Sequence, residues 1–336
     1  MNQEAEKIFC LDNTNNNSNL SKYDKNEDSI YSWANKYYCI FVLNSPFHTQ
    51  RAKKTDLNKF LSYFISTLNT INPDSWTPSI TRGFQNYLTE QKSPKTGIGY
   101  IATTINRILS TIRHFGNWLN KERKLIAGNP FIGVKLIQVE EPSWNGLTLI
   151  EITRLKGACD TRINACTKNN QNPLLEVTVF YVLITTGLRE SELAGLNYGQ
   201  YYAKGFHNVK RKGNKVTKKI PVPSETRNFL DKYLNDRSNL THDSPLIISR
   251  YGNRISTRDI ARICERIAKQ ASAQLPANEK IHLSPHMLRH TFLKRVADKH
   301  GVHTAQDLSG NISMKEIFRY TKPNYEQKYN IVEALY

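Results

Sequence analysis

An arginine and a glutamate stand three residues apart in the segment TTGLRESEL, residues 185–193. Gly187 is suited to ending one helix, and Arg189 then begins the next. Glu192 shares a helix face with Arg189, so its carboxylate can hold the guanidinium in a fixed orientation. A guanidinium held in this way can bind a phosphate bidentately. A surface Arg–Glu pair without any further role explains the same spacing.

A histidine and a second arginine have this spacing in LSPHMLRHTF, residues 283–292. The serine–proline pair before them suits an N-cap and a first helical position. His286 and Arg289 then share one face at a helix N-terminus, which favours a phosphate. His290 completes a His-x-x-x-His pair, but Met287 stands where zinc sites of this pattern carry glutamate. No metal site is expected.

Basic side chains dominate residues 203–224, which contain seven lysines and arginines and no acidic residue. Two β-compatible runs flank Gly213-Asn214, a pair suited to a two-residue hairpin turn. Lys212 stands just before this turn, where a cationic hairpin can place its ammonium beside a backbone phosphate. A charged hairpin that is simply solvated fits the composition too. The neighbouring residues predicted to contact DNA are Lys210, Arg211 and Lys215.

Four tyrosines lie in the final stretch RYTKPNYEQKYNIVEALY. A phenol can pack, donate a hydrogen bond, stack on a base or attack as a nucleophile. Taken alone, the residue type does not separate Tyr320, Tyr325, Tyr329 and Tyr336.

The order of these features is more specific than any one of them. An arginine, a lysine hairpin, His-x-x-Arg and a C-terminal tyrosine follow one another in TGLRESEL, KRKGNKVTKKIPVP, SPHMLRHTF and LSGNISMKEIFRYTKP. In these stretches the sequence resembles the tyrosine recombinase, or phage integrase-type, family and in particular its Xer-like members. The resemblance extends over about residues 30–325.

The resemblance implies a role for each matching residue. Arg189 and Arg289 are implied to clamp the scissile phosphate, with Glu192 supporting Arg189. Lys212 matches the hairpin lysine, which protonates the leaving 5′ oxygen, and His286 matches the assisting histidine. Because negative charge builds on the non-bridging oxygens during attack, fixed arginine donors supply a large part of such catalysis.

One position departs from the family pattern close to the implied nucleophile. The family places its tyrosine, here Tyr320, shortly after Leu-x-Gly-His, and this sequence reads LSGN with Asn311 in the histidine position. An amide can still donate a hydrogen bond to a phosphoryl oxygen. His303 is an alternative source of the imidazole, and a less active or partner-dependent site is a further alternative. Tyr325 is the alternative nucleophile if the register shifts.

Charge and composition bound the kind of protein that carries these residues. The chain has 47 lysines and arginines against 29 acidic residues, a formal charge of +18. Such an excess favours nucleic acid as partner over a basic surface that is merely solvated. The five cysteines are odd in number and form no CxxC pair, which argues against a disulfide scaffold or a zinc ribbon. No apolar run reaches the ~18 residues of a membrane span.

Hydrophobic periodicity predicts a small helical domain followed by a mixed one. A helix over residues 101–121 turns Ile101 inward and leaves Arg107, Arg113 and Lys121 outside as candidate DNA contacts. Further helices are predicted over residues 149–158, 174–185, 224–235, 257–274 and 285–300. The fold expected is mainly α with a small β-hairpin or sheet: a two-domain DNA clamp of a helical core-binding domain and an α+β catalytic domain of the tyrosine recombinase type. The predicted boundaries are a disordered tail 1–28, the core-binding domain 29–136, a linker 137–146, the catalytic domain 147–322 and a C-terminal tail for subunit contacts 323–336.

The function that the resemblance implies is site-specific DNA recombination through a 3′-phosphotyrosyl intermediate, as in Xer-like enzymes or mobile-element integrases and resolvases. It needs neither metal nor ATP, and no cofactor is expected. The implied partners are double-stranded DNA with short recombination sites and other copies of the chain, as a tetramer on two sites. The expected location is the cytoplasm, in association with the nucleoid. Two alternatives stay open: a catalytically impaired DNA-binding member, suggested by Asn311, and a type IB topoisomerase-like enzyme.

Overall fold

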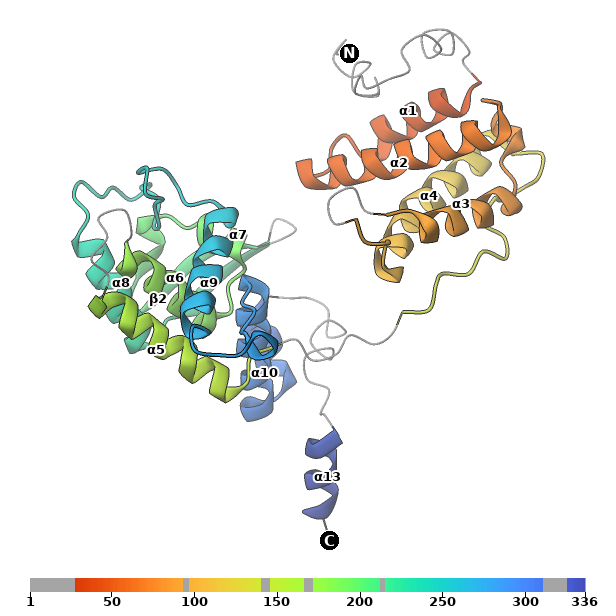
Figure 1. Cartoon of the computed structure of the whole chain (residues 1–336). Helices are drawn as coiled ribbons and strands as arrows, with labels where there is room; N and C mark the ends of the chain where they lie inside the picture. The colour runs from red at the N-terminus through yellow and green to blue at the C-terminus, as the bar shows by residue number, and fades with distance from the viewer. Residues whose placement is uncertain are drawn as a thin grey trace. The chain divides into compact units, whose positions relative to one another are not determined.

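The computed structural model divides the chain into two compact units, Met1–Glu141 and Pro142–Tyr336 (Figure 1). It describes residues 28–92, 97–139, 146–165, 172–211, 215–310 and 325–335. None of the helices in these ranges is long and apolar enough to cross a membrane. The architecture is mainly helical with one small antiparallel sheet, which confirms the predicted fold class.

The N-terminal unit consists of helices that enclose an aromatic core. The two long helices α2 and α4 pack against each other, and α1 and α3 pack against both. Phe60 on α2 lies against Trp76, with 4.4 Å between the ring centroids, and both side chains are fully buried. Contacts of this kind contribute about 0.5–1.5 kcal/mol beyond the area they bury. The helices are α1 (Ile30–Phe41), α2 (Phe47–Leu68), η2 (Pro73–Ser75), α3 (Pro78–Glu90) and α4 (Ala102–Arg123).

Ile101 is an exception to the predicted inward face of α4. Its side chain is 67% exposed, whereas Ile105 and Ile108 further along the helix are buried. Ile101 is the N-cap residue and has an extended backbone, with φ −74° and ψ 153°. The helical period therefore does not yet apply at residue 101, and the prediction for this side chain was wrong.

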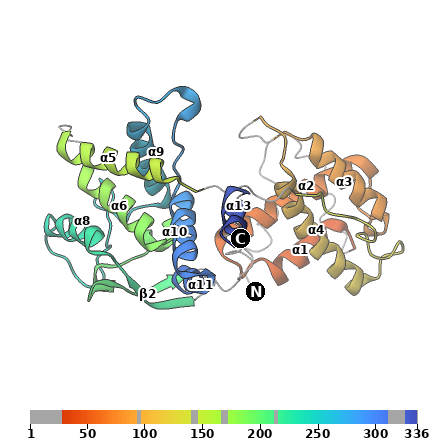
Figure 2. The same cartoon turned by 90° about the horizontal axis from the view of Figure 1, so that it is seen from below.

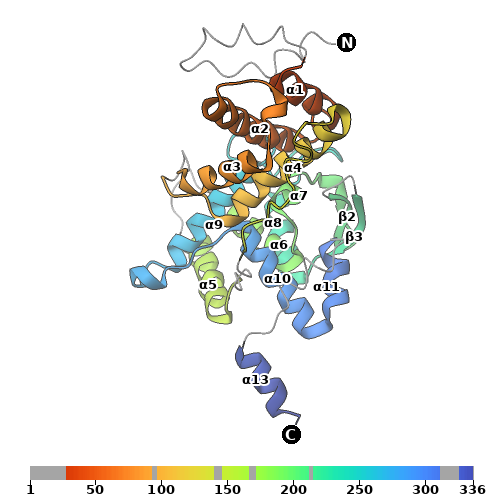
Figure 3. The ribbon, with the colours of Figure 1, turned by 90° about the vertical axis from the view of Figure 1, so that its right-hand side faces the viewer.

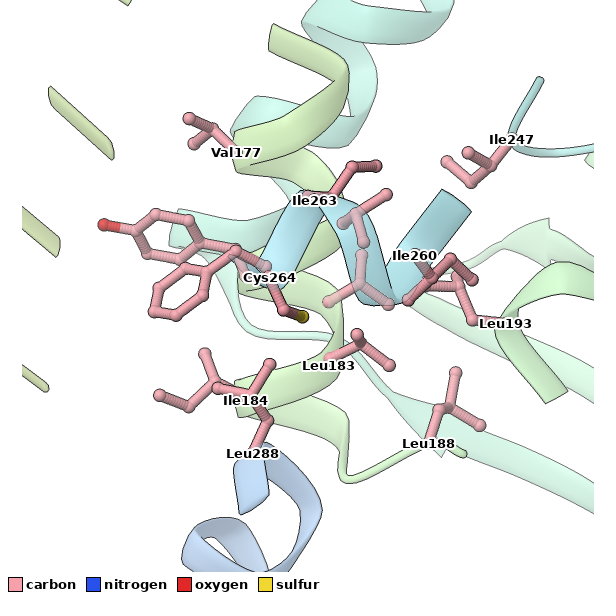
Figure 4. Close-up of a cluster of buried hydrophobic side chains, with 14 of the residues drawn as sticks. Val177, Leu183, Ile184, Leu188, Leu193, Ile247, Ile260, Ile263, Cys264 and Leu288 are labelled. Carbon is pink, nitrogen blue, oxygen red and sulfur yellow. The ribbon is translucent and has the colours of Figure 1, made fainter. Parts of the chain in front are cut away.

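Helix α6 (Pro173–Thr186) is the centre of the C-terminal unit. It is mainly apolar and packs against α5, α8, α9 and α10, as expected for a helix buried on all sides. Figure 4 shows Leu183 and Ile184 of α6 in one cluster with Cys264 of α9 and Leu288 of α10. Burial raises the pKa of the Cys264 thiol to about 12, so this cysteine is a packing residue. The other elements are α5 (Leu149–Ala165), α7 (Glu190–Ala194), η3 (Tyr198–Gln200), α8 (Ser224–Asn235), α9 (Thr257–Ala271), η4 (Ala277–Glu279), α10 (Pro285–His300), α11 (Val302–Ser309) and α13 (Tyr325–Glu333).

The strands of the described residues form one antiparallel sheet in the order β1-β2-β3, with β1 (Tyr201–Tyr202), β2 (Gly205–Arg211) and β3 (Lys215–Pro221). Arg211 pairs with Lys215, so three residues separate the paired strand ends. The two-residue turn expected at Gly213-Asn214 does not match this register. The residues between the strand ends, 212–214, lie outside the described ranges.

The inward face of β2 changes partway along the strand. Phe206 is buried, and strict alternation from there would turn Lys210 inward and Arg211 outward. Asn208 has a φ of +51°, in the left-handed region that asparagine tolerates better than most residues. Beyond Asn208 the pattern is reversed: Val209 and Arg211 are buried, and Lys210 is exposed.

Gly187 ends α6 in a conformation that favours glycine. Its φ is +62°, and a Cβ at this position would overlap the ring of Phe292. We expect Gly187→Ala to lower the free energy of unfolding by more than ~2 kcal/mol, because backbone strain and the steric overlap add. Urea denaturation followed by circular dichroism measures the loss.

The matched control for this change is Gly252→Ala. Gly252 has a φ of +80°, but no neighbouring atom lies within 4 Å of the place that an alanine methyl group would take, so only backbone strain applies. Its expected cost is about 1 kcal/mol. Equal losses for the two variants would show that Phe292 moves aside without cost.

Candidate active site

The candidate site lies where α6, α7, β2, α10 and α11 meet in the C-terminal unit. Figure 2 shows α11 beside the strand labelled β2, and Figure 3 shows the same neighbours from another side. Two hydrogen bonds fix this arrangement: Arg211 on β2 donates to the carbonyl oxygen of Leu308, and Arg289 on α10 donates to that of Ser309. Both acceptors lie at the end of α11, directly before Gly310.

Arg189 and Glu192 form the pair that the sequence predicts. Arg189 is the N-cap of α7, and its Nη1 donates to Glu192 Oε1 at 2.8 Å. The Arg189 backbone N–H donates to Glu192 Oε2 at 2.9 Å, so the carboxylate in the first turn of α7 also binds the N-cap backbone. The Glu192 side chain is 3% exposed and that of Arg189 is 19% exposed. The pair is therefore an interior feature, and the solvent-exposed alternative is wrong for Glu192.

Arg211 is a second partner of the same carboxylate. Its Nη1 donates to Glu192 Oε2 at 2.5 Å, its Nε to Thr217 Oγ1 at 3.0 Å and its Nη2 to the Leu308 carbonyl oxygen at 3.4 Å. The Arg211 side chain is 1% exposed. The sequence predicts this residue as a DNA contact on the hairpin surface. The structure places it inside, on the same side of β2 as the buried Val209.

Arg289 lies buried on α10 and donates hydrogen bonds to two chain segments, the end of α6 and the end of α11. Its Nη1 donates to the Gly187 carbonyl oxygen at 2.5 Å and its Nη2 to the Ser309 carbonyl oxygen at 2.9 Å. The helix begins as the sequence predicts, with the Ser284 side chain accepting from the Met287 backbone N–H. Arg289 thus meets Gly187, two residues before Arg189 in the chain.

His286 lies on the first turn of the same helix with its side chain 62% exposed. Its Nε2 lies 3.7 Å from Glu190 Oε1 on α7. The ring centroids of His286 and His290 are 6.2 Å apart. No group of three or more histidine, cysteine or acidic side chains able to hold a metal ion occurs among the described residues.

The described charges of the site have a positive balance. Arg189, Arg211 and Arg289 contribute three positive charges, and Glu190 and Glu192 contribute two negative ones, which leaves a formal +1 before any histidine charge. Guanidiniums that are fixed by hydrogen bonds before a ligand arrives need no reorganisation when an anion binds. The arrangement is therefore suited to binding a phosphate group.

Three predicted site residues lie outside the described ranges: Lys212, Asn311 and Tyr320. Lys212 directly follows Arg211, Asn311 directly follows Gly310, and Tyr320 lies nine residues after Asn311. The alternative imidazole, His303, is described and is exposed on α11.

The predicted DNA-contacting residues differ in their exposure and in their hydrogen-bond partners within the protein. Lys210 and Lys215 are exposed near the paired ends of β2 and β3. Arg107 on α4 is half-exposed, and its Nη1 and Nη2 donate to the fully buried carboxylate of Asp56 at 2.6 and 2.8 Å. Part of its function is therefore to neutralise a buried acid. Thr111 donates to the same carboxylate at 2.9 Å.

The other two candidates lie further along α4. Lys121 is exposed near its end. Arg113 is partly buried: Nη2 donates to the Val134 carbonyl oxygen at 3.1 Å, and the guanidinium lies 5.3 Å from the ring centroid of Phe131. Burial, with a smaller contribution from the charge of Lys53, lowers the pKa of the neighbouring His114.

Sequence reasoning missed the internal role of Arg211 and the part played by the end of α11. Thr217, which accepts from Arg211, gave no separate signal either. Asn208 adopts a positive φ, as asparagine does more readily than most residues, but β2 pairs with β3 in the same register on both sides of it. The acceptors on Leu308 and Ser309 are backbone carbonyl groups, so no side chain in the sequence marks them.

Comparison with known proteins places these features in a family. The family model described as "Phage integrase family" matches residues 151–327. A tyrosine recombinase XerC of Thermodesulfovibrio yellowstonii is 32% identical over 283 residues, which cover 82% of this chain and 85% of that protein. Another XerC, from Pseudomonas savastanoi pv. phaseolicola, is 26% identical over 306 residues, 88% of this chain and 93% of that protein.

Solved structures show the same fold at low sequence identity. The Tn1549 transposon integrase in complex with a circular intermediate DNA has a TM-score of 0.68 at 17% identity, covering 91% of this chain and 99% of that one. A lambda integrase dimer bound to a COC′ core site has a TM-score of 0.67 at 16% identity, covering 88% and 95%. The family model covers more than half of the residues, and the first relative exceeds 30% identity over most of both chains. The chain therefore belongs to the phage integrase family and is a tyrosine recombinase, an enzyme that cleaves and rejoins DNA strands.

Proposed function

We propose that this enzyme is a site-specific recombinase that exchanges strands between two short DNA sites through a 3′-phosphotyrosyl intermediate. The observation that carries the proposal is the pair of fixed guanidiniums next to Gly187: Arg189 held by Glu192, and Arg289 held by two backbone carbonyl groups. A developing pentavalent phosphate gains most from donors that are already in place.

The chemistry requires a nucleophile and a proton for the leaving group. In our proposal the Tyr320 phenol attacks the scissile phosphorus and releases the 5′ oxygen, which takes a proton from Lys212. Free tyrosine has a pKa of ~10, so a base must help to remove its proton near neutrality. His286 is suited to this step, because it lies exposed on the helix that carries Arg289. The 5′ hydroxyl of another strand then reverses the reaction and regenerates the phenol.

Both units contribute to DNA binding in this proposal. The exposed Lys210 and Lys215 of the hairpin contact the backbone near the cleavage point, and Lys121 with its neighbours on α4 supplies contacts from the helical unit. Each neutralised phosphate adds affinity that does not depend on base sequence and falls with salt. The enzyme would act on duplex DNA of the nucleoid, in the cytoplasm.

The C-terminal helix supports a proposal for assembly. Among the described residues of α13 and the turn after it, Ile331, Val332 and Leu335 are each more than half exposed. Apolar side chains of this kind favour docking against a protein surface, and we propose a neighbouring subunit of a tetramer on two sites. The lambda integrase structure is a dimer bound to a DNA core site, which supports oligomeric action.

The test is a suicide duplex that carries a site selected from a random library by binding to the full chain. A nick placed a few nucleotides beyond the scissile phosphate makes the strand with the freed 5′ hydroxyl short. This fragment diffuses away after cleavage, which traps the covalent adduct. We expect wild type to form an adduct in EDTA and Tyr320→Phe to form none, a loss of at least ~1,000-fold. Denaturing gels measure the adduct.

Tyr325→Phe is the matched control and is expected to keep the adduct. An adduct that persists in Tyr320→Phe and disappears in Tyr325→Phe would move the nucleophile to residue 325. Absence of any wild-type adduct on every bound site would favour the impaired DNA-binding member. Relaxation of a supercoiled plasmid without strand exchange between two sites would favour the topoisomerase-like alternative.

A further inference from the structure

Arg211 has an environment that the hairpin's composition does not lead one to expect. It lies on a strand of a basic hairpin, yet its side chain is only 1% exposed, while its neighbour Lys210 is exposed. Charged side chains are almost never buried to this extent unless they are paired. The guanidinium of Arg211 therefore binds other groups of the protein interior.

The guanidinium contacts three separate elements at once. It donates to Glu192 on α7 at 2.5 Å, to Thr217 on β3 at 3.0 Å and to the Leu308 carbonyl oxygen on α11 at 3.4 Å. A planar guanidinium offers several N–H donors in a fixed fork, which suits three acceptors in different directions. Lysine presents a single ammonium and does not reproduce this geometry.

Gly310, directly after α11, leaves room for the guanidinium. It has a φ of +64°, and a Cβ at this position would lie 2.8 Å from Nε of Arg211. Only a residue without a side chain leaves room for the guanidinium there. Because Arg289 binds Ser309, the end of α11 is held by two buried guanidiniums.

We propose that Arg211 is a positioning residue for strand cleavage. It holds Glu192 in a fixed position relative to the end of α11, and Glu192 in turn orients the guanidinium of Arg189. The inference rests on the proposed function, since it treats Arg189 as a clamp on the scissile phosphate. Glu192 uses one oxygen for each arginine side chain, Oε1 for Arg189 and Oε2 for Arg211. Glu192 Oε2 also accepts from the Arg189 backbone N–H, so without Arg211 the carboxylate is still bonded to α7 but loses its bond to β2 and, through Arg211, to the end of α11. We expect the Arg189 guanidinium to lose its fixed orientation as a result.

The first test compares Arg211→Met with Lys210→Met, its exposed neighbour on the same strand. For Arg211→Met we expect adduct formation at saturating DNA to slow by at least ~100-fold, because a displacement of ~1 Å in a catalytic donor has that effect. DNA affinity should stay within ~2-fold. Lys210→Met, in contrast, should weaken DNA binding in a way that depends on salt. Weakened binding with a normal rate in Arg211→Met would make it a DNA contact and overturn the proposal.

The second test asks whether Arg211 acts through Arg189. If it does, adding Arg211→Met to Arg189→Lys should slow cleavage by less than ~3-fold further, because the interaction it supports is already lost. Full multiplication of the two defects would show that Arg211 acts independently of Arg189, which contradicts the proposal.

The third test does not require cleavage. In the ¹⁵N-arginine-labelled full chain, the Nε–Hε signal of Arg189 is identified by its loss in Arg189→Lys. We expect this signal to shift in Arg211→Met and to stay unchanged in Lys210→Met. If wild type forms no adduct, the proposed function fails while this signal still reports on positioning. An adduct-forming enzyme in which Arg211→Met leaves both signal and rate unchanged refutes the positioning role.

If circular dichroism shows that Arg211→Met does not fold, Thr217→Val is the variant to test instead. It removes one acceptor of Arg211 and keeps the shape of the side chain. We expect a fully folded variant, a smaller shift of the Arg189 signal than in Arg211→Met, and cleavage that is slowed, but less than in Arg211→Met. A normal signal together with a normal rate in Thr217→Val would contradict the proposal.

Discussion

Glu192→Ala is expected to remove a large share of the stability of the C-terminal unit. The Glu192 carboxylate is 3% exposed and accepts hydrogen bonds from Arg189 Nη1, the Arg189 backbone N–H and Arg211 Nη1. Alanine would leave the Arg211 guanidinium buried without its anionic partner, which costs about 3–5 kcal/mol. Domains have a total stability of ~5–15 kcal/mol, so this is a large share. Urea denaturation of the full chain measures the change.

Two further variants separate charge from shape in this prediction. Glu192→Gln keeps an acceptor oxygen but loses the charge, so its loss of stability should be smaller than that of alanine. Glu225→Ala removes an ion pair with Lys156, in which the two side chains are 52% and 37% exposed, and should cost less than ~1 kcal/mol. If Glu192→Ala were as mild as Glu225→Ala, the buried pair would not stabilise the unit.

Arg289→Lys is expected to abolish most cleavage while the chain stays folded. Arg289 joins the Gly187 carbonyl oxygen to that of Ser309 through two different nitrogens, and a lysine ammonium cannot span both acceptors with this geometry. Loss of one preorganised donor to the transition state costs ~100–1,000-fold in rate. We therefore expect single-turnover adduct formation to fall at least ~100-fold, about 2.7 kcal/mol of transition-state stabilisation, with DNA affinity nearly unchanged.

Arg237→Lys is the matched control for this change. Arg237 Nη1 also donates to two backbone carbonyl oxygens, those of Pro245 and Leu246, at 2.9 and 2.7 Å. It contacts none of the described site residues, so Arg237→Lys should lower stability but leave cleavage of bound DNA unchanged. Equal loss of cleavage in both variants would mean that Arg289 acts only by stabilising the fold.

Helix boundaries in the C-terminal unit were predictable wherever local signals decide them. The predicted helices 224–235 and 285–300 have the observed bounds of α8 and α10. For α10 the reason is a serine N-cap, a proline in the first turn and Gly301 at the far end, all adjacent in the chain. Helix α9 ends at Ala271, earlier than the predicted residue 274, where no such strong signal stands.

The sequence by itself determined the family and the mainly helical fold, and it predicted the candidate site residues, because the order and spacing of motifs are local properties of the chain. It also indicated the contact between Arg189 and Glu192, which are one helical turn apart. The tertiary structure alone decided that Arg211 is interior, that it shares Glu192 with Arg189, and that two guanidiniums hold the end of α11. The physical reason is distance along the chain: Arg211 meets a carbonyl group 97 residues away, and Arg289 meets one 102 residues away. Backbone acceptors are the same at every residue, so only folding determines which of them a buried guanidinium binds.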